Sequence, residues 1–291
     1  TVVKKFLIRC SSFLLALVLA AGVIPPVEIA WAAESTADVW DGTITMPTQK
    51  DQYGHYLIST AEELAYIAQT GGVWLERFYY LENDLILNEE TLTVNDNGDI
   101  TNDTSTLNKW TPIGSKSTPF TGYLQGKGHT ISGLYVNNPE MDYVGLFGYT
   151  DYSYPISNVH LTNSYFEGNS GVGGLLGYVG SVISGCTVSD SVTVKGNDSV
   201  GGIAGNCYSL SLYDCTVTAT VDLAVSSDNT DARGAGGIAY AVLNIDNCHM
   251  KTPMNIRHYD RNICVGGICA AAPAGYRCDV TNCTSKGVTC F

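Results

Sequence analysis

A short box of glycine and aliphatic residues recurs five times in the C-terminal half of the chain. These glycine boxes occupy residues 144–149, 173–178, 201–205, 236–240 and 266–270. Their matching glycines are Gly145, Gly174, Gly202, Gly237 and Gly267. Successive matching glycines are 29, 28, 35 and 30 residues apart. Self-similarity at this period indicates a stack of repeats, in which no repeat can bury its apolar face alone.

A second element keeps step with the glycine boxes. It consists of an aliphatic residue, two spacer residues and a small apolar residue. The aliphatic members are Ile156, Ile183, Leu212, Ile245 and Val280. The small members are Val159, Cys186, Cys215, Cys248 and Cys283. A third run often follows, as in residues 191–194 and 219–221, and all these runs are short, rich in β-branched residues and bounded by turn formers, so they predict strands.

Two or three short strands in each repeat of roughly 28–35 residues predict an all-β, right-handed parallel β-helix. Each strand would pair with its counterpart in the next coil, about 4.8 Å away. Like residues would then form columns, with the aliphatic residues filling the core and the glycines permitting tight corners or close backbone approach. A β-propeller blade needs about four strands in roughly 40–45 residues, which this spacing does not hold.

The glycine boxes resemble the GLUG motif, a repeat of bacterial secreted and surface proteins. The same repeat occurs in the non-catalytic N-terminal region of IgA-specific metallopeptidases. Residues 110–114, 119–122 and 126–135 resemble the segment that commonly precedes such repeats, although Gln125 stands where the family has an acidic residue. The resemblance covers roughly residues 40–291, and it implies an architecture more than a biochemical activity.

Residues 1–32 have the pattern of a signal peptide. Lys4, Lys5 and Arg9 precede an almost wholly apolar run over residues 13–24, and Ala30-Trp31-Ala32 offers a cleavage site. A membrane anchor is the alternative, but the apolar run is shorter than the roughly 20 residues that span a bilayer. We therefore expect a secreted or cell-surface protein with no membrane insertion after cleavage.

The remaining chain is strongly acidic. The whole chain carries 15 Lys and Arg against 28 Asp and Glu, a net charge of −13. Removal of residues 1–32 takes away three basic residues and one acidic residue, which leaves 12 against 27 and a charge of −15. This balance disfavours nucleic acid, anionic membranes and anionic polysaccharides as ligands. Polar uncharged surfaces suit neutral glycans or a host or cell-surface protein.

Residues 33–109 differ in character from the repeats over 110–291. Residues 59–71 predict one helix, at about residues 60–70, with Ser59 and Glu62 as a capping box and Gly71 as the stop. We expect this helix to cap the end of the β-helix, followed by early coils from residue 79. Residues 88–108 are expected to be a solvated loop, with a calcium site as the alternative because Asn and Asp oxygens cluster there.

The mature chain would hold nine of the ten cysteines. Cysteines of exported proteins often form disulfides. The shared repeat position of Cys186, Cys215, Cys248 and Cys283 instead favours an internal column of free thiols, and Cys269 also reads as apolar filler. The sequence assigns no role to the remaining four, Cys207, Cys264, Cys278 and Cys290. The paired spacing of a structural zinc site is absent.

No catalytic constellation emerges from the sequence. The chain lacks H-E-x-x-H, G-x-S-x-G and P-loop motifs, and we expect no metal site and no cofactor. His129 reads as a structural side chain in a strand. The insertion at 251–262, flanked by His249 and containing His258, reads as a solvated loop or as a binding protrusion.

A carbohydrate-active β-helix enzyme is the third alternative for function. Such an enzyme needs clustered carboxylates, or a carboxylate with Lys or Arg, on one face of successive coils. The candidates lie at unequal offsets in their repeats, so no cluster follows; they are Asp190, Asp198, Asp214, Asp222 and Asp246. Tyr149, Tyr178 and Tyr208 could line a sugar-binding strip or pack at corners.

These observations together predict a non-enzymatic, exported repeat module for adhesion, binding or spacing. The second interpretation is the non-catalytic N-terminal region of a secreted peptidase resembling the IgA-specific family. The repeats look incomplete at the C-terminus, and any catalytic domain would lie beyond residue 291.

Overall fold

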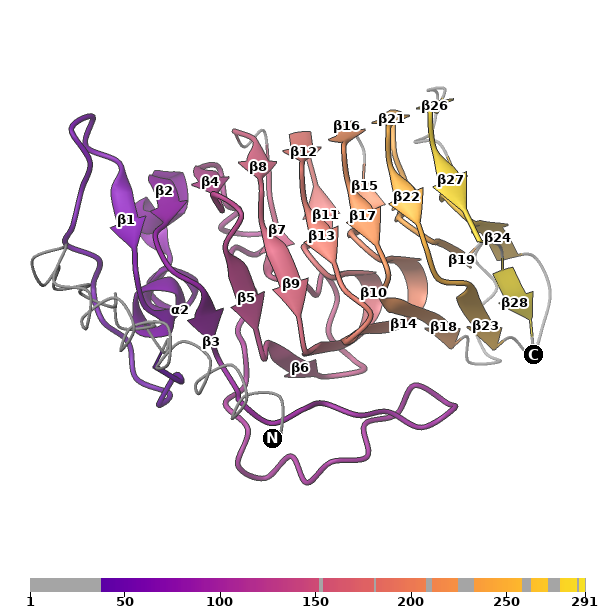
Figure 1. Cartoon of the computed structure of the whole chain (residues 1–291), viewed down its shortest axis with the longest axis horizontal. Helices are drawn as coiled ribbons and strands as arrows, with labels where there is room; N and C mark the ends of the chain where they lie inside the picture. The colour runs from indigo at the N-terminus through magenta and orange to yellow at the C-terminus, as the bar shows by residue number, and fades with distance from the viewer. Residues whose placement is uncertain are drawn as a thin grey trace, which may run out of the picture. The chain divides into compact units, whose positions relative to one another are not determined.

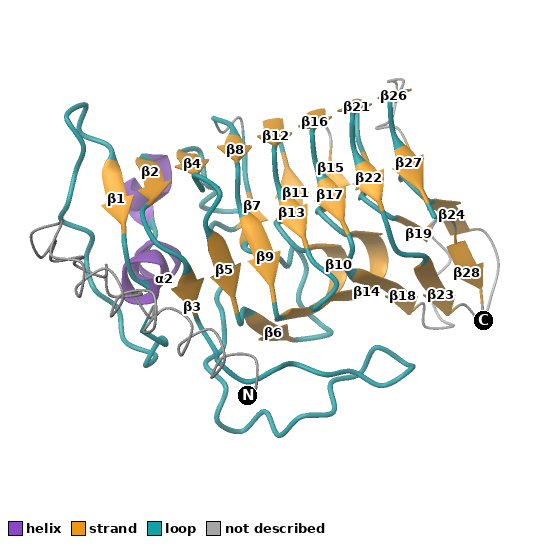
Figure 2. Ribbon diagram, viewed as in Figure 1, coloured by secondary structure: helices purple, strands orange, loops and turns teal. Residues whose placement is uncertain are grey.

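The structure is a computed structural model that describes residues 38–151, 154–180, 182–207, 211–224, 233–257, 263–271, 278–286 and 288–290. The predicted signal peptide lies outside these residues. The described chain is a parallel β-helix, nearly all β, with one α-helix near its N-terminal end (Figures 1 and 2). Every pairing between named strands is parallel, and isolated antiparallel bridges join Lys50 to Tyr56 and Val94 to Ile100.

Four stacks of strands, here called sheets 1 to 4, run along the described unit, and each full coil visits them in that order. Sheet 1 contains β1 (Tyr56–Ile58), β2 (Phe78–Leu81), β4 (Tyr123–Gln125), β8 (Ile156–Ser157), β12 (Val182–Ser184), β16 (Ser211–Tyr213), β21 (Asn244–Asp246) and β26 (Asp279–Thr281). Sheet 2 contains β3 (Leu85–Ile86), β5 (Thr130–Ser132), β9 (His160–Thr162), β13 (Thr187–Val188), β17 (Thr216–Val217), β22 (His249–Met250) and β27 (Thr284–Ser285).

Sheet 3 is built on two ten-residue strands, β10 (Ser164–Gly173) and β14 (Val192–Gly201). Around them lie β6 (Tyr135–Asn137), β18 (Thr220–Ala224), β19 (Arg233–Gly236), β23 (Met254–Arg257), β24 (Ile263–Gly266) and β28 (Val288–Cys290). Sheet 4 contains β7 (Phe147–Tyr149), β11 (Leu176–Val179), β15 (Ala204–Cys207), β20 (Ala239–Ala241) and β25 (Cys269–Ala271).

The aliphatic residues of the second element stack in register along sheet 1. Ile183 pairs with Ile156 on one side and with Leu212 on the other, and Ile245 pairs with Leu212 and Val280. The first four side chains are fully buried. Val280 differs from the expectation of a buried column, because it is 47% exposed and no described strand pairs with the outer edge of β26.

The glycine boxes mark places where neighbouring coils approach closely. The amide of Gly174 donates to the carbonyl of Gly202 at 3.1 Å, and the amide of Gly202 donates to Gly237 at 3.3 Å. A Cβ atom on Gly174 would lie 2.8 Å from the Gly202 oxygen, and one on Gly237 would lie 2.2 Å from the Gly267 oxygen. These distances exclude a side chain, so close backbone approach accounts for these glycines.

The corners between sheets 1 and 2 are formed by residues with positive φ, which occupy a spacer position of the second element. Asn158, Asp214, Asn247 and Asn282 have φ between 51° and 55°, and Gly185 occupies the same place with φ of 64°. Asn, Asp and Gly are the residues that adopt this left-handed conformation most readily. Their side chains also join coils, as where the Asn247 amide donates to Asp214 Oδ1 at 2.6 Å.

The predicted helix is α2 (Ala61–Thr70), and a 3₁₀ turn, η1 (Gly72–Glu76), follows it. Leu64 and Ile67 are buried and line a small interior gap with Tyr79, Phe120 and other core residues of the first coils. The helix therefore packs against the apolar interior of the first coils, and Figure 2 shows it beside β2 and β3 near the N-terminal end of the described chain.

The capping box is shifted by one residue from the predicted Ser59 and Glu62 pair. Thr60 is the N-cap and its Oγ1 accepts from the Glu63 amide at 3.4 Å, while the Glu63 carboxylate accepts from the Ser59 amide at 2.7 Å. Thr60 has extended backbone angles, which an N-cap requires. Gly71 ends the helix as predicted, with φ of 61°.

The buried aliphatic column predicts a large difference between two adjacent substitutions. Ile183→Asp places a charge without a partner in the core and should destabilise the fold by more than about 4 kcal/mol. Ser184→Asp, on the opposite side of the same strand, should change stability by about 0.5 kcal/mol or less. Urea unfolding followed by circular dichroism measures both, and equal losses in the two variants would contradict the burial of this column.

Candidate functional site

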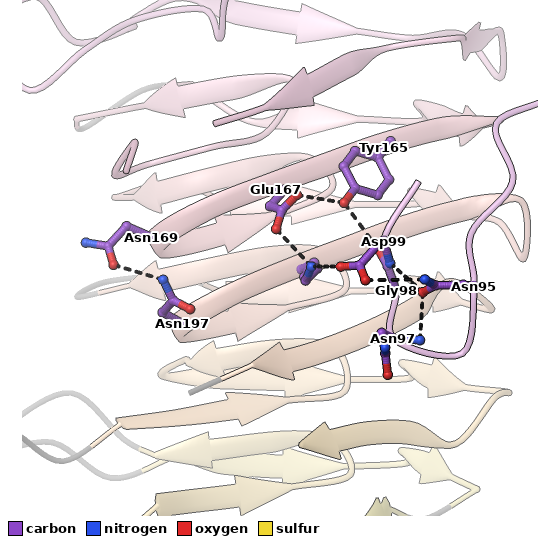
Figure 3. A network of polar contacts seen from close by, with 9 residues as sticks. Asn95, Asn97, Gly98, Asp99, Tyr165, Glu167, Asn169 and Asn197 are labelled. Atoms are coloured by element: carbon purple, nitrogen blue, oxygen red, sulfur yellow. Dashed lines mark hydrogen bonds and ion pairs between the residues drawn. The ribbon is translucent and has the colours of Figure 1, made fainter. Parts of the chain in front are cut away.

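A ladder of ionisable side chains crosses three coils on sheet 3. Glu167 of β10 pairs in register with Lys195 of β14, and Lys195 pairs with Asp222 of β18. Lys195 Nζ lies 2.9 Å from Glu167 Oε1. We name Glu167, Lys195 and Asp222 the carboxylate–lysine cluster, and Figure 3 shows part of it.

The segment 88–108 contacts this ladder through its tip. Most of its residues are exposed, as expected for a solvated loop, but Leu92, Gly98 and Leu107 are buried against the stack. Its tip is a tight turn in which Asn95 Oδ1 accepts from the amides of Asn97 and Asp99 at 2.8 and 3.0 Å. Asp99 Oδ1 then lies 2.5 Å from Lys195 Nζ (Figure 3). A Cβ atom on Gly98, which has φ of 68°, would lie 2.5 Å from Asp222 Oδ2, so the tip contacts the ladder directly.

Apolar packing supports the same docking. Leu92 and Leu107 of the segment form a buried cluster with Tyr135 and Tyr165 of sheet 3. The Tyr165 hydroxyl lies 3.2 Å from the Gly98 carbonyl and 2.8 Å from Glu167 Oε2. Asn163 adds two hydrogen bonds, one from the Leu92 amide and one to the Glu90 carbonyl. Both apolar and polar contacts therefore attach segment 88–108 to sheet 3, and we name this segment the docked loop.

The pKa shifts of Lys195 and Tyr165 are unfavourable for proton transfer at neutral pH. The side chains of Lys195 and Glu167 are 11% and 16% exposed. Burial lowers the pKa of Lys195, but hydrogen bonds to Asp99 and Glu167 outweigh it and raise the pKa above its usual value. Burial, followed by the hydrogen bond to Glu167, raises the pKa of Tyr165. Both groups stay protonated at neutral pH, which makes them poor general bases.

The other candidate aspartates are dispersed. Asp198 accepts from Ser170 on the neighbouring coil at 3.1 Å, and Asp214 accepts from Asn247. Asp246 accepts from Thr281 and Asn282, and these hydrogen bonds lower its pKa. Asp190 is exposed. Of the five aspartates, Asp222 alone belongs to the carboxylate–lysine cluster. Its partners at the same register position are Glu167 and Lys195, so the aspartates of the sequence do not reveal the cluster.

The predicted cysteine column lies along the corner between sheets 1 and 2. Cys186, Cys215 and Cys248 are fully buried, and Cys283 is half-buried. The amide of Cys215 donates to Cys248 Sγ, and that of Cys248 donates to Cys283 Sγ, both at 3.4 Å. Cys269 and Cys278 lie apart from this column with their sulfur atoms 3.3 Å apart, and all six of these cysteines are free thiols.

The tyrosines proposed for a sugar-binding strip pack against one another. The rings of Tyr149 and Tyr178 stack with centroids 4.3 Å apart, and Tyr143 contacts both edge-on at 5.4 Å. Tyr208 lies outside the described residues. Tyr149 and Tyr178 are register partners on β7 and β11 of sheet 4 and both are half-buried, so they stack along a sheet and not at a corner.

The histidines occupy separate surroundings. His129 Nδ1 lies 3.2 Å from Asp84 Oδ1, and His249 Nδ1 lies 2.9 Å from Thr284 Oγ1. His258 lies outside the described residues, as does the end of the 251–262 insertion. No group of three or more His, Cys, Asp or Glu suited to a metal ion occurs in the described part of the chain.

The geometry defines a β-helical repeat protein, and comparison with known proteins agrees with that class. A solved structure, a "putative immunoglobulin A1 protease" from Bacteroides ovatus, matches 82% of this chain and 68% of its own, with a TM-score of 0.59 and 20% identity. This likeness shows the fold. No protein-family model matches the chain.

Two curated relatives match shorter stretches of sequence. Halomucin of Haloquadratum walsbyi is 41% identical over 86 residues, and a "Putative Gly-rich membrane protein" of Evansella cellulosilytica is 36% identical over 56 residues. The matches cover 30% and 19% of this chain but 1% and 6% of those proteins. The chain thus corresponds to a small part of each.

The docked loop predicts a specific role for Lys195. Lys195→Met leaves Glu167 without its partner and should destabilise the protein by about 1.5–3 kcal/mol at pH 7, as expected for hydrogen bonds to charged groups. Because the folded-state pKa of Lys195 is raised, its contribution is complete below the usual value of 10.5 and is lost as pH rises through the folded-state value.

Urea unfolding of the wild type and the variant at pH 7, 9 and 11 measures this effect. The stability difference should be equal at pH 7 and 9 and smaller at pH 11. Lys116→Met, which changes an exposed lysine, is the matched control and should leave stability unchanged. A Lys195 variant as stable as this control would show that the ion pairs do not hold the loop.

Proposed function

We propose that this chain is an exported, non-catalytic repeat module of a bacterial surface or secreted protein, which presents binding surfaces or spaces other domains. The observation that carries this proposal is the carboxylate–lysine cluster. Lys195 is paired with Glu167 and with Asp99 of the docked loop, so a group of side chains that resembles a catalytic site in composition holds a loop in place. The stack itself offers long, regular outer faces, which suit presentation and spacing.

Export is supported by the pattern of residues 1–32 and by the kinds of protein that resemble parts of the chain. One curated relative carries the name of a mucin and another that of a membrane protein. In the described residues no helix is long and apolar enough to cross a membrane. We propose a secreted or cell-surface location, with GLUG-type repeats as the building unit.

A second candidate is the non-catalytic part of a secreted peptidase. The observation that favours it is the fold shared with the Bacteroides ovatus protein over 82% of this chain. In this case the module would position a catalytic domain supplied elsewhere. Both candidates require that the chain itself performs no hydrolysis.

Expression of the full chain, with an initiator Met and a C-terminal tag, in a bacterium tests export. The exported product should begin at Ala33, as read by N-terminal sequencing, and Leu17→Arg in the apolar run should keep the protein in the cytoplasm. Retention of the wild-type chain with residues 1–32 intact would refute export.

The purified product tests the absence of catalysis. We expect no fragments from immunoglobulin A1 and no shortened chains from neutral or acidic polysaccharides, as monitored by mass spectrometry. Cleavage of either substrate, abolished by Lys195→Met or Glu167→Gln, would overturn the non-catalytic proposal.

A further inference from the structure

A partly exposed group of aromatic rings lies on sheet 1, at the end where β1, β2 and β4 are side by side (Figure 1). We define this aromatic surface by His55, Phe78, Tyr80, Tyr123 and Tyr154. Phe78 and Tyr123 are register partners on adjacent strands, with ring centroids 5.8 Å apart. Tyr154 is 57% exposed and its ring lies 4.7 Å from that of Phe78.

The strands hold these rings in fixed positions. His55 contacts Phe78 at 5.4 Å and Tyr80 at 5.3 Å, and Tyr80 contacts Tyr123 at 5.8 Å. Neighbouring rings therefore restrict one another. Phe78 and Tyr80 lie on β2 and Tyr123 lies on β4, and both strands are paired on two sides, whereas His55 precedes the edge strand β1 and Tyr154 precedes β8. Rigid tyrosine side chains supply contact area at a low entropic cost when a ligand binds.

Polar groups surround the rings. Gln125 Nε2 donates to the Tyr123 hydroxyl at 3.3 Å, and the Lys127 ammonium lies 5.2 Å from the centre of the Tyr80 ring. The charges present are paired locally, since His55 Nδ1 lies 2.9 Å from Asp51 Oδ2 and Lys127 Nζ lies 2.5 Å from Glu82 Oε1. The surface thus combines apolar ring area with hydrogen-bonding groups and little net charge.

We propose that this aromatic surface binds a short stretch of a neutral glycan. A sugar ring has an apolar face of C–H groups and an edge of hydroxyls, which matches aromatic rings bordered by amide, hydroxyl and charged groups. The proposal rests on the proposed function, because it names the ligand class of a binding module. The chain's net charge of −13 opposes acidic polysaccharides, so the ligand is uncharged.

The size of the surface distinguishes a glycan from a protein partner. Three strands at a spacing of about 4.8 Å, each of three or four residues, offer an area on the order of 200 Å². A stable protein interface needs about 800 Å² on each partner. The aromatic surface is too small for such an interface, and its length suits a few sugar units.

Affinity electrophoresis of the purified full chain in gels containing neutral glucan, mannan, xylan or galactomannan tests the proposal. We expect one or more of these polymers to retard the wild type, with no change between 50 and 500 mM salt. Tyr80→Ala and Tyr123→Ala should each weaken binding about 2- to 10-fold, the loss expected for one aromatic contact. Tyr213→Ala removes an exposed tyrosine from β16 of the same sheet and should bind as the wild type does.

Circular dichroism and urea unfolding establish that each variant is folded. Absence of binding to every neutral polymer, or equal binding by the Tyr123→Ala variant, would refute the glycan surface while leaving export and non-catalysis untouched. Loss of self-association or of protein binding in Tyr123→Ala, without glycan binding, would assign the surface to a second copy or a protein and would also overturn it. Shortening of a polymer would instead count against the proposed function.

An independent observation concerns Cys269 and Cys278. The geometry also points to a disulfide that forms between these two residues under oxidising conditions. Their sulfur atoms are 3.3 Å apart, so a shift of about 1.2 Å reaches the S–S bond length of about 2.05 Å. The cysteine column differs, because its buried thiols donate to backbone carbonyls, as from Cys215 to Tyr213 at 3.2 Å and from Cys248 to Asp246 at 3.3 Å.

The oxidant would be a low-molecular-weight disulfide. The thiolate of one cysteine attacks it, forms a mixed disulfide and releases one small thiol, and the second cysteine then displaces the other small thiol. The two protein thiols are oxidised and the small disulfide is reduced to two thiols. Burial, followed by the hydrogen bond to Cys278, raises the pKa of Cys269 to about 12, so the reaction should be slow at pH 7 and faster at pH 9.

Incubation of the full chain with oxidised glutathione, followed by non-reducing peptide mapping, tests this pair. We expect one linked peptide joining Cys269 to Cys278, while Cys186, Cys215 and Cys248 react with a thiol label only after denaturation. In Cys278→Ser the link should be lost and Cys269 should be recovered labelled or glutathionylated. Recovery of both thiols unlinked, or linkage of either to Cys264, Cys283 or Cys290, would refute the pairing.

Discussion

The contact on which the whole structure depends is the close approach of one coil's backbone to the next. Hydrogen bonds between successive glycine boxes bring carbonyl oxygens to within 2.2–2.8 Å of where a Cβ atom would stand on Gly174, Gly202 and Gly237. This spacing sets the register of all four sheets, since each coil is one continuous chain. Once the register is fixed, aliphatic side chains meet aliphatic side chains and form a continuous core.

The sequence predicted the parts of the fold that repeat. The β-helix, the aliphatic column from Ile156 to Ile245 and the helix near residue 65 follow from periodicity and local signals, which act between near neighbours in the stack. The left-handed corners were present in the same pattern, at the spacer positions of Asn158 and Asp214, but a polar residue between apolar ones is easily taken for a surface position. The predicted N-cap, Ser59, differs by one residue from the observed N-cap, Thr60, because both side chains can accept the same kind of hydrogen bond.

The candidate site could not be predicted in the same way. Glu167, Lys195 and Asp222 are different residue types at one position of the repeat, so the column carries no repeated letter in the sequence. Its cover comes from the docked loop, and Asp99 is 96 residues away from Lys195 along the chain. A contact between residues so far apart along the chain forms only when the coils are stacked. The segment that carries Asp99 is mostly polar and acidic, so its sequence does not indicate that Leu92 and Leu107 join a buried apolar cluster. Val280 was predicted in the correct register but is exposed, because no described coil covers the outer side of β26.

The docked loop adds contacts between coils that are not neighbours in the stack. In a simple solenoid each coil interacts only with its neighbours, so coils can detach one after another from an open end. The docked loop follows β3, but its Asp99 contacts Lys195 of β14 and its Gly98 contacts Tyr165 of β10. These contacts connect the first coils to coils further along the stack, so those coils cannot detach one at a time. We expect the coils between β3 and β18 to separate as a group, because the loop tip also contacts Asp222 of β18. The stack is thus divided into a cooperative block that resists pulling and peeling, and a more C-terminal part whose described strands pair with those of adjacent coils.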